Sequence, residues 1–213
     1  MCSNDLLCNK AKPLFFLDYF ACSSVKSKQY TEILRSITGA CKKINCSLIG
    51  GETAEHPMSF DIDIAGFSTG IVEEYDIVDG QLIKEGDIII GIESSGIHSN
   101  GYSLINHLIR QKKMKATRDL LTPTYIYTSL VEQLMNEVPV LGMANITGGG
   151  IPENLPRCFP KGLRPHVDYN SWELPNVFKR IMSSGEIPEE EMKKVFNLGI
   201  GYCVVIPKEA EYD

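Results

Sequence analysis

The chain has 213 residues, of which 43% are hydrophobic and 23% charged, and its formal net charge is −6. This is an ordinary globular composition, with enough residues for one large core or two small ones. No apolar run approaches the roughly 20 residues of a membrane-spanning helix, and no lysine and arginine cluster offers a surface to nucleic acid. We therefore expect neither a membrane nor a nucleic acid as a partner. Residues 1–5 do not follow the pattern of a secretory signal, so we expect a cytoplasmic protein.

The cysteines indicate reduced thiols rather than disulfides or a structural zinc site. Their number is odd, no two are spaced as CxxC, and several lie in apolar runs where a thiol acts as a small hydrophobic group. The seven are Cys2, Cys8, Cys22, Cys41, Cys46, Cys158 and Cys203.

The first part of the chain has the pattern of a strand, a helix and a second strand. Residues 13–20 form a strand candidate, apolar residues recur at helical spacing from Tyr30 to Ile44, and residues 46–49 form another strand that ends at a glycine pair. A longer run from Asp61 to Glu74 begins with alternating apolar and polar residues, as a strand does.

The second part begins with a strand over residues 87–92. A polar loop follows, then helices from about residue 102 and over 125–138, a short strand near Val140 and a glycine-rich loop. Helices near 176–182 and 189–196 precede a final strand over 202–206. The pattern predicts an α/β (α+β) fold with two domains, residues 1–82 and 83–213.

The stretch Gly50-Gly51-Glu52-Thr53 suggests a phosphate and magnesium site at the end of a strand. A glycine pair lets the backbone turn sharply and present N–H groups to phosphate oxygens. Since a carboxylate repels phosphate, Glu52 would act through Mg²⁺, with Asp5 as a second acid and Thr53 as a donor. The alternative is an ordinary glycine turn with solvated acids.

The loop over residues 94–103, SSGIHSNGYS, lies between a strand and a helix, where α/β proteins place ligands. His98 is a candidate for donating a hydrogen bond or moving a proton, although a single histidine is more often structural. Ser99 or Asn100 would alternatively cap the helix.

Three consecutive glycines, Gly148 to Gly150, follow Thr147 and precede a predicted helix that has Pro152 near its start. A glycine-rich loop that leads into a helix N-terminus is suited to anions. The stretch matches neither the dinucleotide fingerprint nor the P-loop. Near the last strand, Asn197, Gly199 and Gly201 indicate either a further part of the site or a bulge with tight packing.

Seven motifs together resemble one family, the aminoimidazole ribonucleotide (AIR) synthetases, also called phosphoribosylformylglycinamidine cyclo-ligases. They occur in the family's order from Met1 to about Pro207: MCSNDLL, PLFFLDYFA, CSLIGGETAEHP, AGFSTGIVE, GDIIIGIESSGIHSNGYSL, ITGGGIPENLPR and FNLGIGYCVV. Selenophosphate synthetase, thiamine monophosphate kinase and a hydrogenase maturation factor share the general fold.

The resemblance implies ATP- and Mg²⁺-dependent closure of formylglycinamidine ribonucleotide to aminoimidazole ribonucleotide in purine biosynthesis, by a homodimer whose first-domain strands form the interface. It assigns Asp5 and Glu52 to the metal. The roles implied for the other residues are ATP or phosphate binding by Asn4, Gly50, Gly51 and Thr53; catalysis by His98 and Asn100; and substrate binding by Ser99, Thr147, Gly148, Gly149 and Gly150.

Members of this family carry a further lysine-bearing, glycine-rich segment before the MCSNDLL motif and a longer C-terminal part. We therefore expect this chain to be a truncated form of the two-domain fold. Two alternatives stay open, namely a related ATP-dependent small-molecule kinase and a non-catalytic truncated fragment.

Overall fold

The computed structural model describes residues 1–57 and 62–212. Their contacts divide the chain into two compact units, of which the first covers Met1–Ile77 and the second begins at Val78. The division thus precedes residue 82, where the sequence pattern suggested a domain boundary. No helix among the described residues is both long and apolar enough to cross a membrane.

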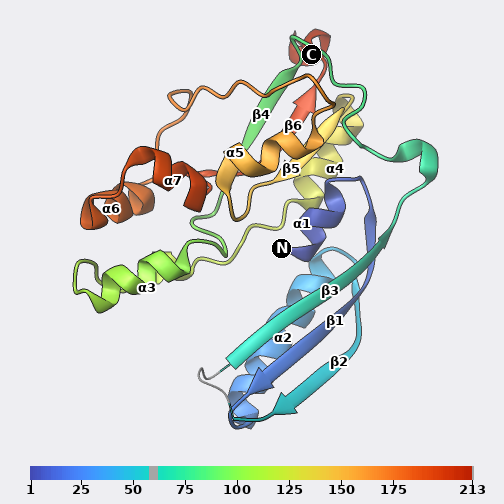
Figure 1. Ribbon diagram of the computed structural model, residues 1–213. Coiled ribbons are helices and arrows are strands. Elements are labelled where there is room, and N and C mark those ends of the chain that lie inside the picture. Colours follow the sequence, from blue (N-terminus) through green and yellow to red (C-terminus); the bar gives the residue numbers. More distant parts are fainter. Residues whose placement is uncertain (58–61, 213) are drawn as a thin grey trace. The chain divides into compact units, whose positions relative to one another are not determined.

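The first unit is a three-stranded sheet with two helices. Along the chain come α1 (Cys2–Leu7), β1 (Lys12–Cys22), α2 (Ser27–Lys43), β2 (Ser47–Glu55) and β3 (Ile62–Ile71), followed by a short 3-10 helix, η1 (Glu74–Asp76) (Figure 1). The strand order is β2-β1-β3, with β1 parallel to β2 and antiparallel to β3. The predicted strand-helix-strand unit is confirmed as β1-α2-β2, while Asp61 of the predicted third strand lies outside the described residues.

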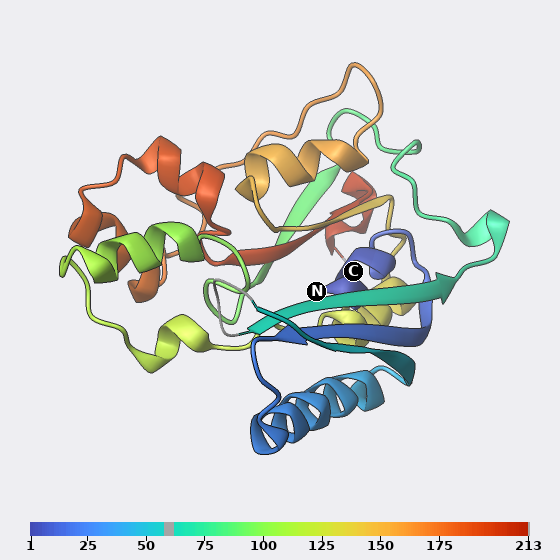
Figure 2. The ribbon, with the colours of Figure 1, turned by 60° about the horizontal axis from the view of Figure 1, so that its bottom comes forward.

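Helix α2 covers one face of this sheet (Figure 2). Phe20 of β1 is buried, and its ring meets the ring of Tyr30 of α2 edge-on, with the ring centroids 5.1 Å apart. Cys22 of β1 and Cys41 of α2 are also buried. The helical spacing seen in the sequence therefore corresponds to the stripe that packs on the sheet.

The prediction that the second strand ends at the glycine pair is wrong. Strand β2 continues through Gly50 and Gly51 to Glu55, and these two glycines pair with Leu17 and Asp18 of β1. Neither glycine has a positive φ. The backbone makes no turn there, so a turn that presents N–H groups to phosphate is not formed at this position.

The second unit contains an antiparallel sheet of β4 (Ile88–Glu93), β6 (Ile200–Ile206) and β5 (Gly142–Asn145), in that order. The helices between the strands are α3 (Tyr102–Arg110), η2 (Arg118–Leu121), α4 (Thr128–Glu137), α5 (Gly150–Asn154), η3 (Leu155–Cys158), α6 (Asn176–Gly185) and α7 (Glu189–Val195). A final 3-10 helix, η4 (Lys208–Tyr212), ends the described part. The elements expected from the sequence are present, with bounds shifted by a few residues.

Two apolar clusters stabilise the second unit. One joins α3, α6 and α7, which lie together in Figure 1, through buried side chains such as Ile105, Phe178 and Met192. The other joins α5 to the sheet through Ile151, Ile200 and Cys203. The second cluster thus packs residues of β5 and β6 against α5, and the loops of the candidate site lie next to these strands.

Candidate functional site

The polar pair Asn4-Asp5 lies on α1 of the first unit, but only one of the two side chains is accessible. Asp5 is exposed, whereas Asn4 is fully buried, with 0% of its surface accessible. Helix α1 packs on β3 and β1. Asp5 is thus accessible from solvent, whereas a direct contact between Asn4 and a nucleotide is not supported by this arrangement.

Glu52 and Thr53 project from opposite faces of β2. The Thr53 hydroxyl forms a hydrogen bond of 2.8 Å with the Tyr30 hydroxyl, so it faces α2. Because successive side chains of a strand alternate, Glu52 faces away from α2. The exposed Glu52 carboxylate accepts a hydrogen bond of 3.0 Å from the Thr53 backbone N–H, so Thr53 orients this carboxylate through its backbone.

Gly51 is explained by packing rather than by a turn. A Cβ at this position would overlap the Asp18 carbonyl oxygen and lie 2.5 Å from Asp18 Oδ1. Asp18, on the central strand, is itself buried, with 8% of its surface accessible. The missing side chain therefore makes room for Asp18, which the sequence alone did not indicate.

The first unit offers oxygen ligands for a divalent cation, without a complete set. No group of three or more His, Cys, Asp or Glu side chains in residues 1–57 and 62–212 is placed to hold a metal ion. Mg²⁺ in nucleotide sites usually takes only one or two carboxylates, with phosphates and water as the remaining ligands. The exposed carboxylates of Asp5 and Glu52 fit that chemistry by donor type.

In the second unit, His98 lies inside the loop that follows β4. Only 4% of its surface is accessible, and its φ is +60°. Nε2 of His98 accepts a hydrogen bond of 3.1 Å from the Ser95 backbone N–H. Burial lowers the pKa of His98 from 6.5 to about 4, so the ring is neutral at physiological pH. This environment favours a role in holding the loop over a role in moving a proton.

Asn197, just before β6, joins the loop after β4 to the rest of the unit. Its Oδ1 accepts hydrogen bonds from the Ser94 hydroxyl at 2.9 Å and the Gly199 N–H at 2.8 Å, and its Nδ2 donates to the Gly96 carbonyl at 2.9 Å. With 3% of its surface accessible, Asn197 is a buried amide with several partners. It positions the loop and does not itself face a ligand.

Gly201 allows three residues of the loop region to pack closely on β6. A Cβ at Gly201 would overlap the Tyr127 hydroxyl, lie 2.5 Å from His98 Cε1 and lie 3.1 Å from Ser94 Cβ. Tyr127 is fully buried and donates a hydrogen bond to the Glu93 carbonyl. Of the two interpretations of the FNLGIG stretch, tight packing therefore accounts for Gly201.

Asn154 organises the glycine-rich loop before α5. Its Nδ2 donates to the carbonyls of Gly148, at 3.0 Å, and Gly150, at 2.8 Å, while its Oδ1 accepts a hydrogen bond of 3.3 Å from the Thr147 hydroxyl. Gly149 and Gly150 have φ values of +91° and +59°, which favour glycine. The loop is thus a fixed structure closed by one buried amide.

The two predicted loops of the second unit lie side by side. A Cβ at Gly148 would be 3.3 Å from Asn100 Oδ1, so the Asn100 side chain lies directly against the glycine-rich loop. Ser99 and Gly148 are exposed and Asn100 is half-buried. The structure therefore brings Asn100 of the first loop against Gly148 of the second.

Sequence reasoning missed Asn154 as a functional residue and left Asn197 unresolved. Both are buried amides that act through the loops rather than on a ligand. Asn154 follows the glycines within the PEN segment and is the last residue of α5, and its only sequence signal is a polar residue between Glu153 and Leu155. That signal does not distinguish a buried amide from a solvated one.

Comparison with known proteins places the chain in a family. A sequence model described as AIR synthase related protein, N-terminal domain, matches residues 1–72, and one for the C-terminal domain of the same proteins matches residues 84–212. Phosphoribosylformylglycinamidine cyclo-ligase of Prochlorococcus marinus (strain NATL2A) is 46% identical over 223 residues, an alignment that covers 98% of this chain and 64% of the relative. The enzyme of the same name from Clostridium tetani (strain Massachusetts / E88) is 49% identical over 214 residues, covering 97% and 64%.

Solved structures agree at the level of the fold. A hydrogenase maturation protein HypE superposes with a TM-score of 0.74 at 18% identity, covering 98% of this chain and 64% of that one. Thiamine monophosphate kinase from Aquifex aeolicus superposes with a TM-score of 0.66 at 18% identity, covering 98% and 69%. The chain spans 64% of the length of the two curated relatives. Because the two family matches together cover nearly the whole chain, it belongs to the AIR synthase related protein family, alongside relatives named phosphoribosylformylglycinamidine cyclo-ligase.

Proposed function

We propose that this chain carries the substrate loops and metal carboxylates of an ATP-dependent cyclo-ligase, which closes formylglycinamidine ribonucleotide to aminoimidazole ribonucleotide in purine biosynthesis. The observation that carries the proposal is the identity of 46% with a curated cyclo-ligase over 98% of the chain. The pairing of Asn100 with the glycine-rich loop supports it, since these loops are the part that a ribonucleotide would contact.

The chemistry requires activation of a poor leaving group. In the proposed reaction ATP phosphorylates the formyl amide oxygen, the amidine nitrogen attacks the same carbon, and phosphate leaves with the former amide oxygen. The protein contributes positioning and neutralisation of charge, as in other phosphoryl transfers. We assign ATP phosphate contacts to Gly50, Gly51 and Thr53, by way of the outer edge of β2 and not by a glycine turn, since β2 is at the end of the strand order β2-β1-β3.

In the second unit we assign substrate contacts to Ser99, Asn100, Thr147, Gly148 and Gly149. Gly150, which was also expected to bind substrate, is buried and donates its N–H to the Thr147 carbonyl at 3.0 Å, so we assign it to shaping the loop. Backbone N–H groups and hydroxyls suit the phosphate and ribose of the substrate. Asn100, which was expected to be catalytic, supplies an amide that orients the substrate against Gly148. His98, also expected to be catalytic, is assigned to hold this loop in place.

Magnesium would be held by Asp5 and Glu52, both exposed carboxylates. The ion would offset the negative charge of the ATP phosphates. Glu52 has the better defined geometry of the two, because the Thr53 N–H fixes its Oε1. Asn4, being buried, would support α1 rather than contact ATP.

The test is turnover by the purified chain with formylglycinamidine ribonucleotide, ATP and Mg²⁺, followed as ADP and as the aminoimidazole product. We expect ADP and aminoimidazole ribonucleotide in equal amounts. A phosphorylated substrate that accumulates without ring closure would instead indicate a small-molecule kinase, the activity named in one of the structural neighbours. If the chain shows no turnover and does not bind Mg-ATP in titration calorimetry, it is a non-catalytic fragment.

We also propose that the protein is a cytoplasmic homodimer. Leu17 of β1 and Phe67 of β3 are cross-strand neighbours on the sheet face opposite α2, with 37% and 62% of their surfaces accessible. Exposed apolar side chains that adjoin on a sheet face are typical of an interface. Glu52 projects from this same face, so a second copy would lie close to the proposed metal ligand.

A further inference from the structure

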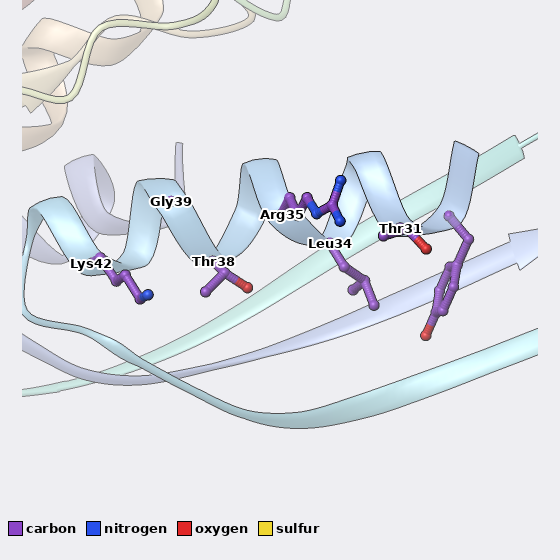
Figure 3. Close-up of a pocket in the computed structure, with 7 residues that line it drawn as sticks. Thr31, Leu34, Arg35, Thr38, Gly39 and Lys42 are labelled. Carbon is purple, nitrogen blue, oxygen red and sulfur yellow. The ribbon is translucent and has the colours of Figure 1, made fainter. Parts of the chain in front are cut away.

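A groove of about 360 Å³ lies along α2 in the first unit, on the side of the helix next to β2. Figure 3 shows Leu34, Thr38 and Lys42 projecting toward this side. The other labelled residues that line the groove are Thr31, Arg35 and Gly39. The function proposed above uses none of these residues.

Two cations in the groove have no acidic partner. Neither Arg35 nor Lys42 forms an ion pair with a carboxylate in the part of the chain that the structure describes. They are two helical turns apart on one face of α2, about 10 Å along the axis, with Thr38 between them. Two unpaired positive charges with a hydroxyl between them complement a ligand that has more than one anionic group.

Gly39 leaves the helix backbone open at the middle of the groove. It lies in the middle of a helix of 17 residues, is exposed, and does not have a positive φ. A Cβ at Gly39 would meet nothing within 4 Å. Glycine in a helix interior is less favourable than alanine, and no neighbour in the described chain excludes a Cβ at this position. An absent side chain does let a ligand approach the helix backbone closely.

One end of the groove is fixed by contacts between α2 and the sheet. The Tyr30 hydroxyl, which lines the groove, is 2.8 Å from the Thr53 hydroxyl of β2. The Tyr30 ring also packs edge-on against Phe20 of β1. At this end the groove therefore has an aromatic ring packed on the sheet and a pair of hydrogen-bonded hydroxyl groups.

We propose that this groove binds a small molecule carrying two or more phosphate groups. Arg35 would hold one phosphate with its planar guanidinium, Lys42 would neutralise another, and the Thr38 hydroxyl would donate between them. The volume lies within the usual range of small-molecule sites, roughly 300–1,000 Å³. One end of the groove adjoins Thr53, which is assigned above to the ATP phosphates, whereas its two cations lie on α2 and Glu52 projects from the opposite face of β2. The proposal does not require the proposed reaction.

The test is titration calorimetry of the chain with tripolyphosphate in the presence of EDTA, which removes Mg²⁺ and leaves a magnesium-dependent nucleotide site silent. Orthophosphate serves as the ligand with a single phosphate. We expect saturable binding of tripolyphosphate and at least about tenfold weaker binding of orthophosphate, because the latter reaches only one of the two cations. The double variant Arg35→Gln/Lys42→Gln should bind tripolyphosphate at least about tenfold more weakly than the parent.

Two further variants distinguish specific binding in the groove from non-specific attraction of the anion to the positive charges of α2. Lys28→Gln/Lys43→Gln removes the same charge from α2 outside the groove and should keep the affinity within about twofold. Gly39→Ala should raise the urea midpoint of unfolding while weakening tripolyphosphate binding. Equal losses in the two double variants, no binding by the parent chain, or unchanged affinity in Gly39→Ala would each overturn the proposal.

Discussion

Glu52 is an exposed carboxylate that the Thr53 backbone N–H holds in one orientation. If it is a magnesium ligand, Glu52→Gln should weaken Mg-ATP binding by about tenfold or more, since the neutral amide is a much poorer ligand for a hard cation. The free energy of unfolding should change by less than about 0.5 kcal/mol, because the side chain lies on the surface. Titration calorimetry and urea unfolding measure the two effects.

Glu32→Gln is the matched control, because Glu32 is an exposed glutamate of the same unit on α2. It should leave Mg-ATP binding unchanged. Equal affinity in Glu52→Gln and the parent chain would remove Glu52 from the metal site.

His98 makes the stability of the second unit depend on pH. Burial lowers its pKa in the folded state from 6.5 to about 4, so folding favours the neutral ring. The resulting stabilisation is complete above pH 6.5 and is lost as the pH falls from 6.5 towards 4, by up to ~3 kcal/mol. Urea unfolding across this range, followed by a probe in the second unit, should show the decline.

His98→Gln keeps a hydrogen-bond acceptor for the Ser95 N–H but cannot titrate, so this part of the pH dependence should disappear. His107→Gln alters an exposed histidine of α3 and should retain the parental profile. A parental profile in His98→Gln would show that His98 does not cause the decline.

The glycine-rich loop before α5 depends on one residue, Asn154, for its closure. Asn154→Asp replaces the amide that donates to the carbonyls of Gly148 and Gly150 by a group that cannot donate to them when ionised. With two carbonyls deprived of their donor, we expect a loss of roughly 2–4 kcal/mol in the free energy of unfolding. Urea unfolding measures this loss, and Asn106→Asp, at an exposed position of α3, should change stability far less. A loss no greater than that of Asn106→Asp would contradict the role of Asn154.

The order and type of the elements could be predicted from the sequence, because apolar residues recur with the period of the helix or strand that buries them. The extent of β2 could not. Its Gly50-Gly51 pair is typical of a strand end, and the need for Gly51 arises from Asp18 on a neighbouring strand. A contact between residues far apart in the chain leaves no local pattern.

The same limit applied to the loops of the candidate site. The density of polar and glycine residues around His98 and Gly148 was visible in the sequence, and the structure brings Asn100 and Gly148 together. Of the residues that hold these loops, Asn154 was missed and Asn197 was left between two interpretations, because an asparagine in the sequence does not reveal whether its amide is buried. The burial of His98 also could not be predicted from the sequence, and it changes the proposed role of this residue from catalysis to positioning of the loop.

At the scale of the whole molecule, the proposed second copy would cover the exposed apolar face of the sheet in the first unit. Phe67→Lys places a charge in the middle of the exposed apolar face beside Leu17. If a second copy buries this face, desolvation of the ammonium group should weaken association by about tenfold or more. Sedimentation or light scattering over a range of protein concentrations gives the dissociation constant directly.

Tyr75→Lys provides the comparison for this surface, because Tyr75 is an exposed aromatic residue of the same unit, with 86% of its surface accessible, in η1 rather than in the sheet. It introduces the same charge and should leave association unchanged. A parent chain that stays monomeric at every concentration would contradict the homodimer, and a dimer that survives Phe67→Lys unweakened would move its interface away from the β1–β3 face. Weaker Mg-ATP binding by the Phe67→Lys monomer would further link the dimer to the magnesium site, because Glu52 projects from this same face.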